Sequence, residues 1–201
     1  GNVQFGYDNA TFGGFVGYNT LMGHTGFEAR VTGAYNPGKV SIQRAQLIAN
    51  EPGMGLAGLN ASGVYGQIGY GFEVINNVVI TPFAGIRYTD VTRNSYTEQA
   101  NTLVLYPVGY NAFTQSIVTG LGGGRINGKI IEKLGYEIGG GIECDYARSL
   151  NAFSGYSYIN YIGSFSYNNT NAPWNGVRPF GLAGLTYDVA ANQRITANAT
   201  V

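Results

Sequence analysis

Three carboxylates lie close together in one stretch of the chain, KLGYEIGGGIECDY at residues 133–146. They are Glu137, Glu143 and Asp145, and they alternate with an unbroken apolar row. Two carboxylates that share proton-transfer chemistry must lie roughly 5–10 Å apart. Glu137 and Glu143 are six residues apart, which is about 20 Å along an extended strand. They therefore do not form an acid/base pair, and we expect each to pair with an arginine of another strand. The candidate partners are Arg30, Arg87 and Arg178.

The other residues of catalytic type give no recognisable site. His24 is the single histidine and lies in a predicted turn, so any Ser-His-Asp or Cys-His site would have to use it. Cys144 is the single cysteine and falls in an apolar row, and one histidine with one distant cysteine does not hold a metal. The glycine run GLGGGRING at 120–128 lacks the Lys-Ser/Thr of a phosphate loop. The sequence therefore predicts no enzyme, no metal site and no cofactor.

The composition excludes several classes of protein. Charged residues make up 11% of the chain, against about 25% in ordinary soluble domains. The formal net charge is +0, so the chain carries no electrostatic footprint for nucleic acid. A single cysteine rules out an internal disulfide. The chain has no apolar run long enough for a transmembrane helix and does not open like a signal peptide.

Apolar and polar residues alternate with a period of two along most of the chain, which is typical of β-strands. This spreads the apolar residues instead of gathering them in runs, as in membrane β-barrels. The clearest segments are 25–35, 63–74, 80–90, 134–146, 177–189 and 194–201. Weaker segments are 3–8, 12–19, 39–47, 112–125 and 156–167. The pattern predicts an all-β, up-and-down antiparallel transmembrane β-barrel with about eleven strands and no helix.

Turn signals separate these segments, and short turns alternate roughly with longer loops, as in outer-membrane barrels. The predicted turns are 8–9, 36–38, 76–77, 127–128 and 191–192. The predicted long loops are 49–61 and 94–111. The phase of 112–125 stays open: if Ile117 and Leu121 face lipid, Arg125 does too and must lie at a membrane edge.

The polar phase of the strands carries glycines and sparse charges of both signs. The hydrated face of a soluble β-sandwich would carry many Lys, Glu and Thr instead, so this phase favours the wall of a confined, water-filled lumen. The residues that we predict to line the lumen are Glu28, Arg30, Gln67, Glu73, Arg87, Glu137, Glu143, Asp145, Arg178 and Asp188. Two readings of the charges remain open: they only satisfy one another, or they act directly in transport.

Tyrosines gather near the ends of the apolar rows. In a membrane barrel they would form aromatic girdles at the level of the lipid headgroups. The alternative is a tyrosine-rich soluble sandwich that packs them in its core. The predicted girdle residues are Tyr35, Tyr70, Tyr88, Tyr136, Tyr146 and Tyr187. Trp174 is predicted to be an interfacial anchor.

Residues 69–99 resemble the core of an autotransporter β-domain, the translocator of type V secretion. The shared features are a Gly-Tyr-Gly-Phe strand end, a Pro-aromatic strand that ends in Arg-Tyr, and a later Tyr-x-Glu, all present in GYGFEVINNVVITPFAGIRYTDVTRNSYTEQ. LGYEIGGGIECDY at 134–146, the tail at 175–201 and the upstream stretch at 50–72 are similar to further family segments in the same order. The resemblance covers most of the chain from about residue 25 onward.

The resemblance implies a barrel of twelve strands in the bacterial outer membrane that anchors and exports an N-terminal passenger. It also implies outer-membrane lipid and the barrel assembly machinery as partners. The family pattern has a helix before the first strand and a last strand that ends in an aromatic residue, and neither is visible before Val3 or at Val201. We therefore expect residues 1–201 to be one translocator domain without its final strand. Because open edges are costly in lipid, missing residues or another chain's strand must close it.

Three other functions remain open at this point. The chain could be an outer-membrane barrel without a passenger, acting as a passive pore, an adhesin or a structural protein. It could be a barrel enzyme that uses His24, in which case removing that side chain would abolish activity. It could also be a soluble glycine-rich sandwich, which would stay monodisperse without detergent.

Overall fold

The computed structural model describes residues 2–5, 10–19, 24–44, 51–102, 104–157, 163–168, 176–190 and 193–200. In these residues the chain forms thirteen strands. No helix in the described part of the chain is able to span a membrane. The strands are β1 (Asn2–Phe5), β2 (Phe12–Tyr18), β3 (Gly26–Arg44), β4 (Gly53–Ile75), β5 (Val78–Arg93), β6 (Tyr96–Thr97), β7 (Val108–Tyr110), β8 (Phe113–Ile131), β9 (Leu134–Leu150), β10 (Phe153–Ser157), β11 (Ser164–Tyr167), β12 (Val177–Ala190) and β13 (Gln193–Thr200).

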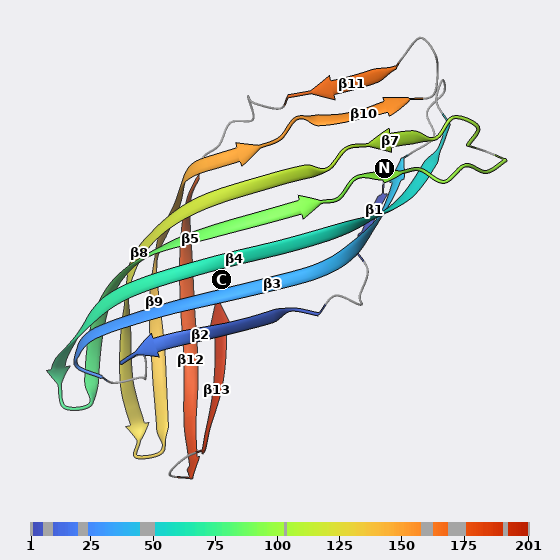
Figure 1. Cartoon of the computed structure of the whole chain (residues 1–201). Coiled ribbons are helices and arrows are strands. Elements are labelled where there is room, and N and C mark those ends of the chain that lie inside the picture. Colours follow the sequence, from blue (N-terminus) through green and yellow to red (C-terminus); the bar gives the residue numbers. More distant parts are fainter. Residues whose placement is uncertain are drawn as a thin grey trace.

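Nine strands form one antiparallel sheet. Its order is β3-β4-β5-β8-β9-β12-β13, with β1 and β2 both paired to the outer side of β3. The sheet curls strongly: β3, β4 and β5 run side by side across the view, while β12 and β13 stand nearly upright (Figure 1). From β3 to β13, each strand of this sheet pairs with the strand of the sheet that precedes it in the chain and with the one that follows it. This is the up-and-down connectivity that the sequence predicted.

The two ends of the sheet differ in their connections. At one end, which we call the turn end, tight turns join β4 to β5 at Asn76 and Asn77 and β8 to β9 at Glu132 and Lys133. At the other, the loop end, the connections are longer and carry β6, β7, β10 and β11. Asn77 has a positive φ of 66°, as a tight hairpin turn requires, and the turn predicted there is confirmed.

The main strands are longer than the sequence suggested, and the described chain has thirteen strands where the sequence predicted about eleven. The turn predicted at 36–38 is wrong, because β3 runs unbroken through Pro37, which pairs with Asn60 of β4. On the other side of β3, the described pairing stops at Tyr35 and begins again at Val40, so the proline lies where that ladder is interrupted. The predicted turn at 127–128 lies within β8, and most of the loop predicted at 49–61 belongs to β4. The turns predicted at 8–9 and 191–192, and Trp174, lie outside the described residues.

The four short strands form a second sheet of order β6-β7-β10-β11, which we call the loop-end sheet. Its order repeats that of β5, β8, β9 and β12. In the chain, β6 follows β5, β7 precedes β8, β10 follows β9 and β11 precedes β12. The segment after β5 also stays beside β4: the Asn94 N–H donates to the Gly58 carbonyl at 2.8 Å, and the Gln99 N–H to the Met54 carbonyl at 2.9 Å. The loop-end sheet therefore continues the wall of the main sheet beyond its loop end.

The concave face of the main sheet is identified by side chains that meet across intervening strands. The rings of Phe83 on β5 and Phe180 on β12 have centroids 6.3 Å apart, although β8 and β9 lie between them. Neighbouring strands are about 4.8 Å apart, so two strands of separation can be bridged only on the inside of the curve. Ile117, Leu121 and Arg125 have the same phase as these rings, which settles the open phase of 112–125.

The convex face of the main sheet is apolar and exposed. Val64, Ile68 and Ile142 are 55%, 57% and 59% exposed, and many other large apolar side chains share this face. The buried apolar residues of the described chain are few, namely Val40, Ala57, Val79, Phe83 and Val104. A soluble monomer rarely exposes apolar area on this scale. The arrangement is instead that of a membrane barrel, with its apolar side chains directed outward.

Candidate functional site

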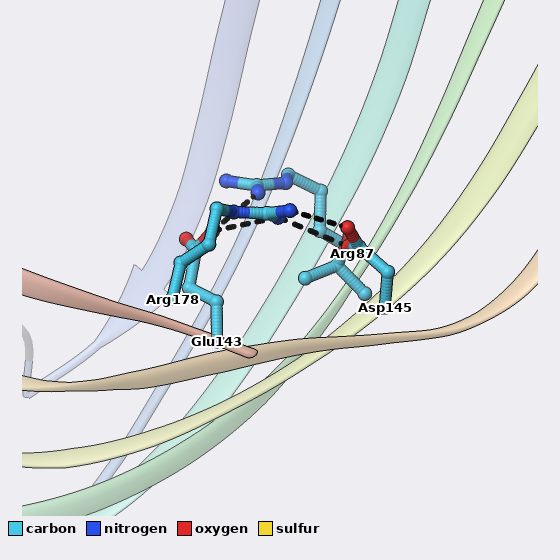
Figure 2. Close-up of polar contacts among 5 residues, drawn as sticks. Arg87, Glu143, Asp145 and Arg178 are labelled. Carbon is cyan, nitrogen blue, oxygen red and sulfur yellow. Dashed lines mark hydrogen bonds and ion pairs between the residues drawn. The ribbon is translucent and has the colours of Figure 1, made fainter. Parts of the chain in front are cut away.

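A ladder of alternating charges crosses the concave face toward its loop end. Arg87 on β5 donates to the Glu143 carboxylate on β9 at 2.9 Å, and Arg178 on β12 contacts the same carboxylate at 3.4 Å. Arg178 also binds Asp145 at 2.5 Å, and Thr119 donates to Asp145. Figure 2 shows the Arg178 guanidinium between the two carboxylates. The four charged side chains neutralise one another, so this face is polar without a net charge.

The exposure of these side chains shows which of them remain open to the interior. The Asp145 side chain is 2% exposed and the Glu143 side chain 18%, whereas Arg178 is 47% exposed. The acids are therefore covered by their partners, while the arginines present their outer edges. Charges that are paired and hydrogen-bonded in this way offer little free binding energy to a passing chain.

Two further ion pairs extend the polar lining in both directions. Toward the turn end, Arg125 on β8 pairs with Glu28 on β3, and Glu28 is 7% exposed. At the loop end of the main sheet, Arg44, the last residue of β3, donates from two nitrogens to Glu98 at 2.8 and 2.9 Å. The Val108 N–H also donates to Glu98 at 3.0 Å, and the hydrogen-bonded carboxylate raises the pKa of Arg44. Sequence reasoning missed Arg125, whose phase it left open, and Arg44 and Glu98, which it placed near or in predicted loops.

Glycines and phenylalanines form one row across the concave face. In register order the row is Phe83, Gly123, Gly141 and Phe180, so the two rings meet over the two glycines. A Cβ atom on Gly141 would collide with the backbone of Gly122 and Gly123 on β8. The neighbouring backbone thus approaches too closely for any side chain, and these glycines permit the tight curl of the sheet.

The turn end of the concave face holds a polar cavity of about 290 Å³. His24, Glu73, Lys129, Lys133 and Asp188 are among its lining residues. Among the described residues, no serine or cysteine lines it and no group of three side chains is suited to a metal ion. Glu137 lies one row further in and accepts from Asn127 at 3.4 Å. The hydroxyl residue among the described lining residues is Thr186.

The predicted lumen residues are brought together only in part. Glu143, Asp145, Arg87 and Arg178 form the ladder, whereas the partner of Glu137 among the described side chains is the Asn127 amide. Arg30 is not among their partners; its guanidinium lies 4.9 Å from the Phe15 ring centroid on β2. Gln67 accepts from the Tyr65 hydroxyl at 2.7 Å. By register, all ten predicted residues have the concave phase of their strands.

The predicted girdle tyrosines have the convex phase of their strands. Five of them are between 45% and 59% exposed, namely Tyr35, Tyr70, Tyr88, Tyr146 and Tyr187. The sixth, Tyr136, is half-buried against Gly128 of β8. Tyr70, Tyr136 and Tyr187 lie toward the turn end, and the other three lie further along the strands toward the loop end.

The concave face changes character in the loop-end sheet. Tyr96 and Tyr110 stack with centroids 4.9 Å apart, and the Phe153 and Phe165 rings lie 5.7 and 6.0 Å from Tyr110. Arg93, the last residue of β5, places its guanidinium 5.0 Å from the Tyr96 centroid. Burial raises the pKa of Tyr96 to about 12 and also raises the pKa of Tyr110. This part of the lining is therefore aromatic.

Comparison with known proteins identifies the family. The model of the autotransporter β-domain matches residues 7–201. The chain belongs to the autotransporter β-domain family. Among solved structures, the chain is similar to the translocator domain of the autotransporter NalP from Neisseria meningitidis, with 16% identity and a TM-score of 0.66. The match covers 96% of this chain and 60% of that chain. No curated protein matched the chain.

Membership of this family confirms several sequence predictions. The all-β fold class, the place in the bacterial outer membrane and the class of translocator barrel are confirmed. The solved structure, at 16% identity, supports the fold alone, and this chain spans 60% of its length. How the chain handles a polypeptide is therefore a matter of proposal.

Proposed function

We propose that residues 1–201 are one translocator domain whose concave face forms the hydrated wall along which an N-terminal polypeptide leaves the cell. The single observation that carries this proposal is the contrast between the two faces of the same strands. On β9, Ile138 and Ile142 on the convex face are 58% and 59% exposed, while Glu143 and Asp145 on the concave face are held in ion pairs. Lipid on one side and water on the other account for this contrast.

The tyrosines set the position of the wall in the membrane. Tyr136 and Tyr146 are ten residues apart on β9, which is about 33 Å along a strand. Barrel strands tilt by roughly 40°, so this length spans about 25 Å across the bilayer, the height of the apolar band of outer-membrane barrels. Such barrels have short periplasmic turns and long outer loops. We therefore assign the turn end to the periplasm and the loop end to the cell exterior.

The neutral lining suits the passage of an unfolded chain. A surplus of one sign would retain segments of the opposite charge. The ladder of Arg87, Glu143, Arg178 and Asp145 has two charges of each sign. In this proposal the charges serve the wall itself, and the domain performs no catalysis.

Two partners are proposed for the sheet. Outer-membrane lipid covers the exposed apolar convex face, and, as membership of the family implies, the barrel assembly machinery inserts the sheet. The described β2 and β13 each pair on one side only, with β3 and β12. Because unpaired backbone is costly in lipid, additional strands must complete the wall in the membrane.

The test is export from intact cells. An epitope tag is placed in the passenger of the full-length protein, and antibody binding and protease access are measured on unbroken cells. We expect the tag at the surface together with a folded barrel that changes its gel migration on heating. A folded barrel whose tag stays in the periplasm would contradict the proposal and favour a pore, adhesin or structural barrel. A chain that stays monodisperse without detergent would contradict the membrane assignment.

A further inference from the structure

The loop-end sheet continues the wall but reverses its polarity. In the membrane wall the apolar side chains have the convex phase. In the loop-end sheet the convex phase carries small polar residues and one tyrosine, namely Thr97, Gly109, Ser154, Tyr156, Ser164 and Ser166. The concave phase carries the rings of Tyr96, Tyr110, Phe153, Phe165 and Tyr167. Water on the outer side explains the polar convex face, but it does not explain why the inner face remains aromatic.

The concave rings form a continuous surface rather than scattered contacts. The register sets Tyr96, Tyr110, Gly155 and Phe165 in one row, and Phe153 with Tyr167 in the next. A Cβ atom on Gly155 would collide with the Phe165 ring, so that ring covers the glycine. Phe113 of β8 joins the row at the membrane side, with its centroid 6.5 Å from that of Phe153. The aromatic surface therefore starts where the charged wall ends.

This surface is not closed over by the described residues. Phe153 is 38% exposed and Tyr167 64% exposed, although both have the concave phase. Exposed aromatic area in water favours a binding role over a packing role. The surface also lacks free charge, because the Arg44 and Glu98 side chains bind each other and the Arg93 guanidinium lies over three rings.

We propose that the concave face of the loop-end sheet binds apolar and aromatic side chains of the exported polypeptide as it leaves the lumen. This inference rests on the proposed function. The occupant follows from continuity: the concave face of β5, β8 and β9 runs directly into this surface, so a chain that follows the wall must pass it. The neutral wall below does not retain the chain, whereas the rings bury apolar side chains and oppose backward sliding.

The chemistry of the surface distinguishes this occupant from a lipid headgroup. Phosphate groups of a glycolipid would require exposed lysine or arginine. Arg93 donates to the Asn111 carbonyl at 2.6 Å and is covered by rings, and Arg44 is held by Glu98. The sheet thus presents ring faces to its interior and hydroxyl groups to the exterior.

The test is photo-crosslinking during export. A photo-reactive phenylalanine analogue replaces Phe153 on the concave face or Tyr156 on the convex face in the full-length protein with its tagged passenger. These positions are three residues apart on one strand and are 38% and 39% exposed, so they differ mainly in the face they occupy. We expect crosslinks to the passenger from position 153, at least several-fold more than from position 156.

The outcomes separate the two proposals. Tagged passenger at the surface with equal crosslinks from both positions, or with none, overturns this inference and leaves the proposed function intact. Crosslinks from position 153 to glycolipid alone overturn it as well. Failure of the parent protein to display any passenger overturns the proposed function first. As a second measurement, Phe153→Ala combined with Tyr110→Ala should slow passenger appearance several-fold while the heat-modifiable barrel persists. An unchanged rate would overturn the inference.

Discussion

The concave face of this protein has two regions with opposite chemistry. In the main sheet it carries paired charges, with Arg178 between Glu143 and Asp145, and a row of glycines that the Phe83 and Phe180 rings cross. In the loop-end sheet, the next strands along the chain line the same side with stacked rings such as Tyr96 and Tyr110. The convex face changes in the reverse direction, from exposed isoleucines to serines and threonines.

This difference shows what alternation along a strand reports. A period of two reveals that the two faces meet different media, but it does not reveal which medium lies inside. Where lipid surrounds the wall, the apolar phase must point outward, and where water surrounds it that requirement disappears. The change occurs between Tyr88, on the convex face of β5, and Tyr96, on the concave face of β6.

The largest loss of barrel stability is expected from Gly141→Val, which tests whether the two regions of the concave face differ. The added side chain collides with the backbone of β8, at a cost of about 3 kcal/mol or more because a strand cannot move aside easily. We expect no heat-modifiable barrel after refolding in detergent. Gly124→Val is the matched control, because a Cβ atom there meets nothing within 4 Å. Gly155→Val, in the loop-end sheet, should leave the barrel intact, and equal loss in all three variants would contradict the assignment.

A charge on the convex face should distinguish lipid from water. Ile138→Arg, at a site 58% exposed on the membrane wall, should cost about 2–4 kcal/mol if the site lies near the bilayer midplane. Ser166→Arg, on the convex face of the loop-end sheet, should change stability by less than about 0.5 kcal/mol. Equilibrium unfolding in lipid vesicles measures both. Similar costs at the two sites would show that the same medium surrounds both regions.

The charge ladder should depend on the forked shape of one arginine. Arg178→Met leaves Asp145 without its arginine and Glu143 with Arg87 alone, and we expect a loss of about 2 kcal/mol because Arg178 is partly exposed. Arg178→Lys should lose about half as much, since a lysine holds one carboxylate but not both. Denaturant midpoints in detergent give the two values. A methionine variant as stable as the parent would show that the ladder does not support the wall.

The smallest effect is expected from alkaline pH, and only in the loop-end sheet. Burial raises the Tyr96 pKa from 10.0 to about 12. Between these values the unfolded chain has released the proton and the folded chain has not, so stability falls as the pH rises. Below pH 10 the Tyr96 hydroxyl is neutral in both states, so its contribution to stability is fully present. Hydrogen exchange of the Val108 N–H should accelerate in that window, while main-sheet amides change less. Tyr96→Phe should reduce the change, and an unaltered profile would contradict it.

The sequence by itself determined the main features of the wall. Strict alternation around Glu137, Glu143 and Asp145 indicated the strand and its two faces, and the glycines and sparse charges of the polar phase indicated which face meets lipid. These properties are local, because a residue's phase in an extended chain depends only on its neighbours. For the same reason the order of family segments was readable, and the family was confirmed. Local signals failed at Pro37, where a proline was taken as a turn although an interruption in the neighbouring ladder accommodates it.

The tertiary structure decided everything that depends on partners across strands. The sequence named Arg30, Arg87 and Arg178 as possible partners of the acids. The register of β12 against β9 set Arg178 opposite Glu143, and the curl of the sheet brought Arg87 to Glu143 across β8. The tertiary structure likewise paired Arg44 with Glu98, which are 54 residues apart, although sequence reasoning placed Arg44 in a weak strand segment and Glu98 in a long loop. Distances between strands follow from register and curvature, and these are set by glycines and neighbouring backbones far apart in the chain.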